Sequence, residues 1–111
     1  MVVWIFSVKK AREFLLENGY VYTVRGHLKK QGKGWFTDKR GGKKIGDCWA
    51  LLVKTIYDPT FEKYKLRGIL ANYVMHSGFD SVEEWIEEIK RVNHGKIPDT
   101  VYLYYVALKP I

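Results

Sequence analysis

The segment CWALLVKTIY, residues Cys48–Tyr57, decides the fold. Apolar side chains occupy both sets of alternating positions along most of it, a pattern typical of a strand that is covered on both faces. Gly46 and Asp47 lead into the segment. Asp58 and Pro59 end it, because proline cannot donate a ladder hydrogen bond. We therefore expect Cys48–Tyr57 to be the central strand of a sheet.

The segment before that strand, Arg25–Lys44 (the basic segment), carries the excess charge of the chain. It contains eight basic residues and one acid, so its net charge of +7 equals that of all 111 residues. Glycines and the pair Trp35 and Phe36 are interspersed with these bases. The segment has neither helical nor strand periodicity, which predicts a long excursion from the sheet. Long loops inside compact domains are usually functional or disordered.

Four further strands are expected from short runs of β-branched and aromatic residues between turn-forming residues. In the third of them, Gly68 would make a bulge or a bend. The expected strands are Val2–Phe6, Tyr20–Arg25, Leu66–Met75 and Thr100–Lys109.

Two helices are expected from apolar residues at helical spacing. Ser7 would be the N-cap of the first, which ends at Asn18 and Gly19. Ser81 and Glu84 form a capping box ahead of the second, and Gly95 and Pro98 end it. The apolar stripes are Val8, Ala11, Phe14 and Leu15 in the first helix, and Val82, Trp85, Ile86 and Ile89 in the second.

The expected order of elements is therefore β, α, β, long loop, β, β, α, β, which is an α+β fold. Two helices cannot cover so many strands as separate layers. A small mixed β-barrel flanked by two helices is the economical arrangement, and it forms a single domain over residues 1–111.

Composition excludes several classes of protein. Hydrophobic residues make up 47% of the chain and aromatic residues 15%, which excludes wholesale disorder. No apolar run is long enough to span a bilayer, and the opening residues Met1–Phe6 lack the features of a secretion signal. One Gln and three Asn occur among many Lys and Glu, a bias reported for hyperthermophile proteins.

Cysteine and histidine usage indicates neither a disulfide nor a metal site. Cys48 is the lone cysteine, which favours a reducing, cytoplasmic setting, and its apolar strand makes it a core residue. His27, His76 and His94 are scattered, with no carboxylate or cysteine at ligand spacing. We expect no cofactor and favour a monomer.

The run Leu16-Glu17-Asn18-Gly19 leads into the strand Tyr20–Arg25, and the basic segment and Gly46-Asp47 follow. This arrangement resembles the PUA-like superfamily, in particular its ASCH-type branch and the small archaeal proteins of unknown function within it. The resemblance covers nearly the whole chain in element order, and it rests on Gly19, Arg25, Gly46 and Asp47. It implies a pseudobarrel that binds RNA, modified bases or nucleotides, and some ASCH members hydrolyse RNA or modified nucleosides.

The chain departs from the ASCH-type signature G-x-K-x-x-E-x-R. Val21 stands at the lysine position, Val24 stands at the acid position, and Arg25 comes one residue early. In amidohydrolase-like members a lysine activates a threonine. Thr23 is present in the comparable strand, but without a basic partner its hydroxyl is a poor nucleophile. The resemblance therefore transfers a binding fold better than a catalytic site.

Clustered cations with interspersed rings predict a nucleic-acid-binding domain, for RNA or a single-stranded or modified nucleotide more than for duplex DNA. Lysines would contact phosphates, Arg25 would anchor the base of the loop or reach a phosphate, and Trp35 or Phe36 would stack on a base. The predicted interface is Arg25, Lys29, Lys30, Lys33, Trp35, Phe36, Lys39, Arg40, Lys43 and Lys44.

Three alternatives remain open. A small hydrolase of RNA or modified nucleosides would place Thr23, Arg25 and Asp47 near a pocket at the barrel mouth. A protein-interaction module would use the basic segment to bind an acidic partner. The segment could also be a solvated loop that only keeps the protein soluble, with Trp35 and Phe36 covering the barrel.

Overall fold

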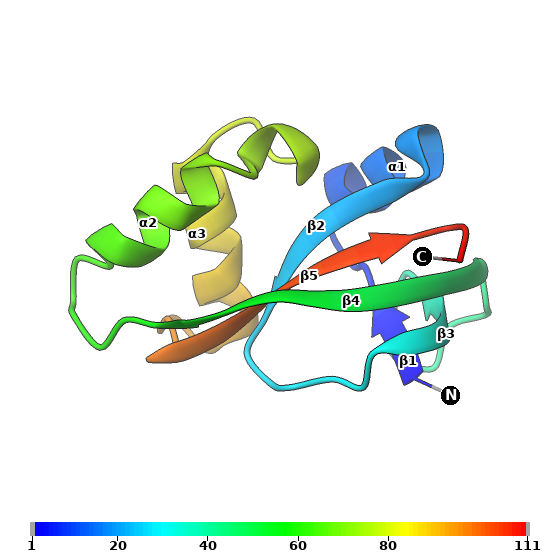
Figure 1. Ribbon diagram of the computed structural model, residues 1–111, viewed down its shortest axis with the longest axis horizontal. Helices are drawn as coiled ribbons and strands as arrows, with labels where there is room; N and C mark the ends of the chain where they lie inside the picture. The colour runs from blue at the N-terminus through cyan, green and yellow to red at the C-terminus, as the bar shows by residue number, and fades with distance from the viewer. Residues whose placement is uncertain (1, 111) are drawn as a thin grey trace.

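The computed structural model describes residues 2–110 and has an α+β fold (Figure 1). Five strands form one sheet in the order β1-β3-β4-β5-β2, with β1 and β3 parallel and all other neighbours antiparallel. The sheet curls into a half-barrel whose edges are β1 and β2. The strands are β1 (Val2–Ile5), β2 (Tyr20–Arg25), β3 (Gly32–Thr37), β4 (Gly46–Tyr57) and β5 (Thr100–Ala107), and the helices are α1 (Lys9–Asn18), α2 (Tyr64–Ala71), the 3₁₀ turn η1 (Val74–His76) and α3 (Val82–Val92).

β4 is the central strand of the sheet, as its sequence predicts. Its coverage is less complete than the sequence suggests. Cys48 and Ala50 are buried on one face, whereas Leu51 and Tyr57 are 45% and 58% exposed. An irregularity between Leu52 and Lys54 shifts the register with β5. β4 is therefore buried on one face and only partly covered on the other.

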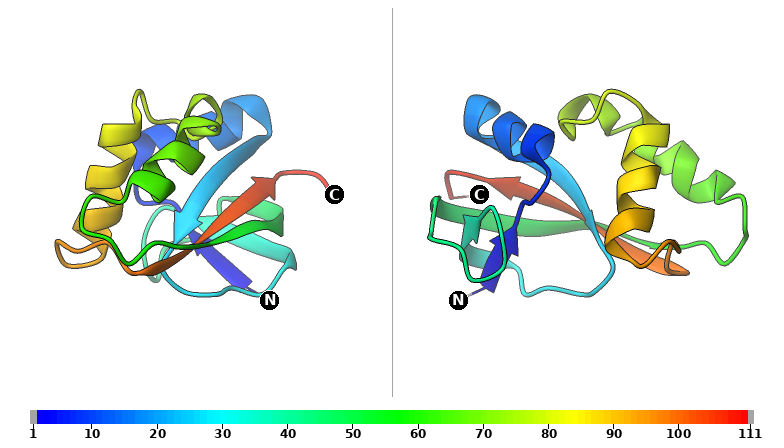
Figure 2. Two further views of the ribbon diagram at one scale, coloured as in Figure 1. Left: turned by 60° about the vertical axis from the view of Figure 1, so that its left-hand side comes forward. Right: turned by 180° about the vertical axis from the view of Figure 1, so that it is seen from behind.

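The two faces of the sheet carry separate cores. The inner face packs against α1, and its core contains Trp4, Phe36, Cys48 and Tyr104. The outer face is covered by α2 and α3 around Ile56, where β4 ends and β5 begins, and over the adjoining part of β2 at Tyr22 and Val24. Figure 2 shows these two helices at one end of the sheet, away from β1 and β3. On β2 the turn η1 also lies over this face, because His76 contacts Tyr20 and Tyr73 contacts Tyr22. Among the described residues, the part of the outer face formed by β3 and the start of β4 has no helix packed on it.

The segment Leu66–Met75, expected as a strand, is instead α2 followed by η1. Leu66 and Leu70 are buried one helical turn apart, so the apolar pattern has the helical period. Gly68 lies within α2 and has open space around it rather than marking a bulge. The abundance of β-forming side chains here is overridden by packing against α3.

The basic segment is not a structureless excursion, because it contains the strand β3. A Cβ on Gly34 would lie 2.4 Å from the backbone oxygen of Val2, so the close approach of β1 requires a glycine there. Gly32 adopts a φ of 98° at the start of the strand. The glycines that permit this pairing have no side chains, so they interrupt the alternation of apolar and polar residues by which a strand is recognised in a sequence.

The two longer helices begin differently. Ser7 is not an N-cap, because α1 starts after Val8 and its N-cap makes no side-chain hydrogen bond. Gly19 ends α1 in the left-handed conformation with a φ of 82°, as expected. The Ser81 hydroxyl accepts a hydrogen bond from the Glu84 backbone N–H at 3.1 Å. The Glu84 carboxylate accepts from the N–H of Asp80 rather than that of Ser81, so the capping box is only half formed.

Candidate nucleic-acid interface and the neighbouring pocket

The uncovered part of the outer face carries a row of aromatic side chains. Residues directly opposite each other on paired strands project from the same face. Lys33 of β3 pairs with Trp49 of β4, and Trp35 pairs with Asp47. Both tryptophans are half-buried, and the Lys33 ammonium lies 5.7 Å from the centre of the Trp49 ring. β3 and β4 thus present two indole rings and a cation on one face.

The row continues across β5 to β2, where its last two rings are partly covered by Tyr73 and His76. Trp49 pairs with Ala107, and Ala107 pairs with Tyr20. Tyr105 stacks on Tyr20 with ring centres 5.7 Å apart and contacts Tyr22 at 5.3 Å. The outer aromatic face is therefore defined by Trp35, Trp49, Tyr105, Tyr20 and Tyr22, with Lys33 beside Trp49.

Most cations of the basic segment have no acidic neighbour. Within residues 2–110, Lys44 is the one base of this segment within 4.0 Å of a carboxylate, through an ion pair with Asp47 at 2.6 Å. The hydrogen bond from Lys44 lowers the pKa of Asp47. The exposed bases of the segment are Lys30, Lys33, Lys39, Arg40, Lys43 and Lys44. A surface of this kind retains a positive field that paired charges would cancel.

The structure separates the remaining predicted interface residues from this face. Phe36 is completely buried in the inner core, so it cannot stack on a base. Lys29 is half-buried, its ammonium lies 5.1 Å from the centre of the Trp4 ring, and its backbone N–H and C=O both bond the Tyr104 hydroxyl. Arg25 pairs with Tyr102 of β5. Its charge and that of Lys29 lie near each other, because both cations contact the Trp4 ring.

Arg25 bridges β1 and β2, the two edge strands of the sheet, which do not pair with each other. We call the gap between these two strands the seam. Arg25 Nη1 donates to the backbone oxygen of Ile5 at 2.9 Å, and its Nε donates to the hydroxyl of Thr23 at 3.3 Å. The guanidinium also lies 4.8 Å from the centre of the Phe6 ring and 5.2 Å from that of Trp4. Burial lowers the pKa of Arg25 to about 10, so it is still a cation at neutral pH.

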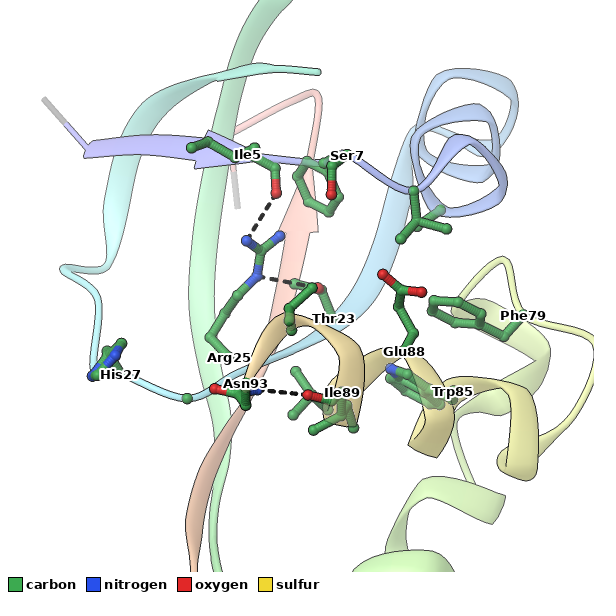
Figure 3. Close-up of a pocket in the computed structure, with 16 residues that line it drawn as sticks. Ile5, Ser7, Thr23, Arg25, His27, Phe79, Trp85, Glu88, Ile89 and Asn93 are labelled. Atoms are coloured by element: carbon green, nitrogen blue, oxygen red, sulfur yellow. Dashed lines mark hydrogen bonds between the residues drawn. The ribbon is translucent and has the colours of Figure 1, made fainter. Parts of the chain in front are cut away.

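A pocket of about 320 Å³ opens beside this guanidinium (Figure 3). It lies between the end of β1, the edge strand β2 and the helix α3, and we call it the seam pocket. Arg25 and Thr23 face it from β2, and Glu88 points into it from α3. Its apolar wall includes Trp85 and Ile89. The volume falls at the lower end of the range for small-molecule sites.

The hydrolase arrangement expected from Thr23, Arg25 and Asp47 is not assembled. Thr23 and Arg25 line the seam pocket, but Asp47 is not among its lining residues and lies opposite Trp35 on the outer face. No lysine lines the pocket either, so the lysine–threonine pair of the amidohydrolase-like members is not formed there. The sequence did not single out Glu88 and Trp85 as pocket residues. Their spacing on one face of α3 is the pattern that could have placed them together.

Cys48 is unsuited to act as a nucleophile, and the described residues form no metal-binding cluster. Cys48 is fully buried, and burial raises its pKa to about 11, which confirms it as a core residue rather than a thiolate. Within residues 2–110, no group of three or more histidine, cysteine or carboxylate side chains could hold a metal ion. None of the helices in this part of the chain is long and apolar enough to cross a membrane.

Comparisons with known proteins add no family: no protein-family model matches the chain, and no curated protein or solved structure is significantly similar to it.

Proposed function

We propose that the protein binds single-stranded RNA, or a single strand carrying modified nucleotides, across the outer aromatic face and the exposed cations of the basic segment. The observation that carries the proposal is the placement of Trp35, Trp49 and Lys33 on one uncovered face. Unpaired bases stack on aromatic rings regardless of sequence, while lysines neutralise the phosphates.

The charge distribution supports a polyanionic ligand. A surface that only confers solubility usually mixes charges of both signs, whereas here the carboxylate of Asp47 is already paired with Lys44. Lys39, Arg40 and Lys43 lie in the connection from β3 to β4, just beyond the end of the hairpin where Trp35 pairs with Asp47. They would meet the backbone of a strand whose bases lie on the tryptophans.

We also propose that the half-barrel is a pseudobarrel of the PUA-like kind. The order of elements and the bridge that Arg25 makes between β2 and β1 support this assignment. RNA and nucleotide binding in that superfamily agrees with the ligand class proposed for the outer aromatic face.

Fluorescence titration with a uridine oligonucleotide tests the proposal, because Trp35 and Trp49 report on ligand directly. Trp35→Ala is expected to weaken binding by about 1–3 kcal/mol, and Trp35→Phe to retain much of the affinity. Phe61→Ala is the matched control, because Phe61 is an aromatic ring 94% exposed outside this face. Equal affinities for Trp35→Ala and Phe61→Ala would refute the proposal.

A further inference from the structure

The Arg25 guanidinium is a cation in the interior with no anion beside it. Within residues 2–110, no carboxylate lies within 4.0 Å of it. Its neighbours are the Ile5 carbonyl, the Thr23 hydroxyl and the faces of Trp4 and Phe6. Removing a charge from water is costly unless it gains a partner of opposite sign, and dipoles and ring faces supply only part of that compensation.

One edge of the guanidinium is left free. Nη1 and Nε donate to Ile5 and Thr23, but Nη2 donates to no acceptor within residues 2–110. Nη2 is not sealed from solvent either, since Trp4 Nε1 is the one buried side-chain nitrogen or oxygen without a partner in this part of the chain. Figure 3 shows the guanidinium at the wall of the seam pocket. A hydrogen-bond donor with a positive charge is therefore open to the cavity.

The opposite wall suits an apolar or aromatic group. Trp85 and Phe79 line the cavity and stack on each other with ring centres 5.9 Å apart and an angle of 18°. Ile89 and Val8 add aliphatic surface. A cavity with mostly apolar walls and a few converging polar groups is the common form of a small-molecule site.

We propose that the seam pocket binds a small organic anion, with its carboxylate or phosphate at the free edge of Arg25 and its apolar body against Val8 and Phe79. Guanidinium groups bind carboxylates and phosphates through charge-assisted hydrogen bonds. The Thr23 hydroxyl, which already accepts from Nε, can donate its own proton to the same anion. The site goes beyond RNA binding, because it lies away from the outer aromatic face.

Glu88 limits which anions can enter. Its carboxylate points into the cavity, but it is ion-paired with Arg91 of the same helix, which offsets part of its charge. The remaining negative charge disfavours an anion in the pocket. Replacing it with the isosteric neutral Gln removes that repulsion, so the two charged residues have opposite effects on the same ligand.

Phenylacetate and its neutral analogue phenylacetamide are a matched pair of probes of nearly the same size and shape, one of which is charged. Binding is measured by quenching of tryptophan fluorescence and by ligand-observed NMR. A dissociation constant on the order of 1 mM is expected for an anion of this size. Phenylacetate is expected to bind roughly tenfold more tightly than the amide because it supplies the missing charge. Equal binding of the two probes, or no binding of either at about 20 mM, would overturn the proposal.

Phenyl phosphate distinguishes the two sources of negative charge. Tighter binding than phenylacetate would assign the pocket to phosphate monoesters, and weaker binding would assign it to carboxylates. In either case at least one of the two anions must bind more tightly than the neutral amide. A uridine oligonucleotide added in the same experiment separates this site from the outer aromatic face, because it should not compete with the bound probe.

Three variants locate the effect. Arg25→Gln is expected to abolish the preference for phenylacetate, whereas Lys54→Gln, which removes the same charge from an exposed position on β4, should leave it unchanged. Glu88→Gln is expected to tighten phenylacetate binding roughly two- to fivefold without changing the affinity for the amide. If Arg25→Gln fails to fold, the comparison of probes on the native protein and on Glu88→Gln still decides the proposal. Unchanged phenylacetate affinity in Glu88→Gln would count against it.

Discussion

The charged residues of the helices and those of the basic segment are arranged in opposite ways. Outside the basic segment, six of the eleven bases lie within 4.0 Å of a carboxylate among residues 2–110. Lys10 alone contacts both Asp80 and Glu84, which ties α1 to the start of α3. In the basic segment only Lys44 has such a partner within residues 2–110. Exposed ion pairs add little stability, but they cancel the field of their cations.

The difference indicates separate tasks for the two regions. The helical region has paired charges over a packed core, which is typical of a structural layer. The basic segment combines unpaired cations with half-buried rings, which favours a ligand that brings its own negative charge. Variants that change one property and spare the other can test this division.

The largest expected effect is on the helical region. Trp85 is 2% exposed and packs between α3 and the sheet, so Trp85→Ala should lower the free energy of unfolding by about 3–5 kcal/mol through loss of buried area and formation of a cavity. Urea denaturation followed by circular dichroism measures this change. A loss below about 1 kcal/mol would mean that this layer is not a packed core.

The next effect is on RNA affinity and its dependence on salt. Replacing Lys39, Arg40 and Lys43 with Gln removes three cations without a carboxylate partner within residues 2–110. If each contacts a phosphate, affinity for single-stranded RNA at 0.1 M salt should fall by roughly 10- to 100-fold, and the logarithmic salt slope should flatten by about 2.

A control variant with the same loss of charge separates local contacts from net charge. Lys9, Lys90 and Arg91 are each paired with a carboxylate on their own helix. Replacing all three with Gln should leave the salt slope close to that of the native protein. Equal losses of affinity in both triple variants would show that only net charge matters, and the contrast between the two regions would have no functional meaning.

The sequence predicted the parts of the fold where local patterns and packing agree. β4, the left-handed Gly19 and the buried face of α3 follow from apolar spacing and turn chemistry. β3 was missed because its glycines are required by the closeness of β1, a contact that no local pattern reveals. α2 was taken for a strand because its residues favour β structure, and only packing against α3 decides otherwise.

The candidate sites were predictable to different degrees. Clustering of bases in the basic segment is a property of the sequence, but which face each ring occupies depends on strand register. One position separates the half-buried Trp35 from the fully buried Phe36. The seam pocket brings together Arg25 and Glu88 from elements far apart in the chain, so only the fold could reveal it.

A smaller effect is expected at the helix starts. The Ser81 hydroxyl accepts the Glu84 N–H, so Ser81→Ala should lower stability by about 1 kcal/mol. Ser7 makes no capping bond to α1, so Ser7→Ala should change stability by less than about 0.5 kcal/mol. Thermal melts of the two variants side by side make the comparison. Equal losses would mean that Ser7 caps α1 after all.

The smallest expected effect is on the stability of variants in the basic segment, compared with variants in the helices. Lys39, Arg40 and Lys43 lie close together in the sequence, and none has a carboxylate partner within residues 2–110, so they repel one another when no ligand is bound. The triple Gln variant should therefore match or exceed the native protein in stability, within about 0.5 kcal/mol, and any gain should shrink as salt screens the repulsion. The control triple of Lys9, Lys90 and Arg91 should instead lose a little stability, because its ion pairs are broken. Thermal melts of both triple variants at low and high salt measure whether each change in stability is a gain or a loss. A loss of stability in the basic-segment variant that matches or exceeds the loss in the control would show that these cations serve the fold, and the separation of tasks between the two regions would fail.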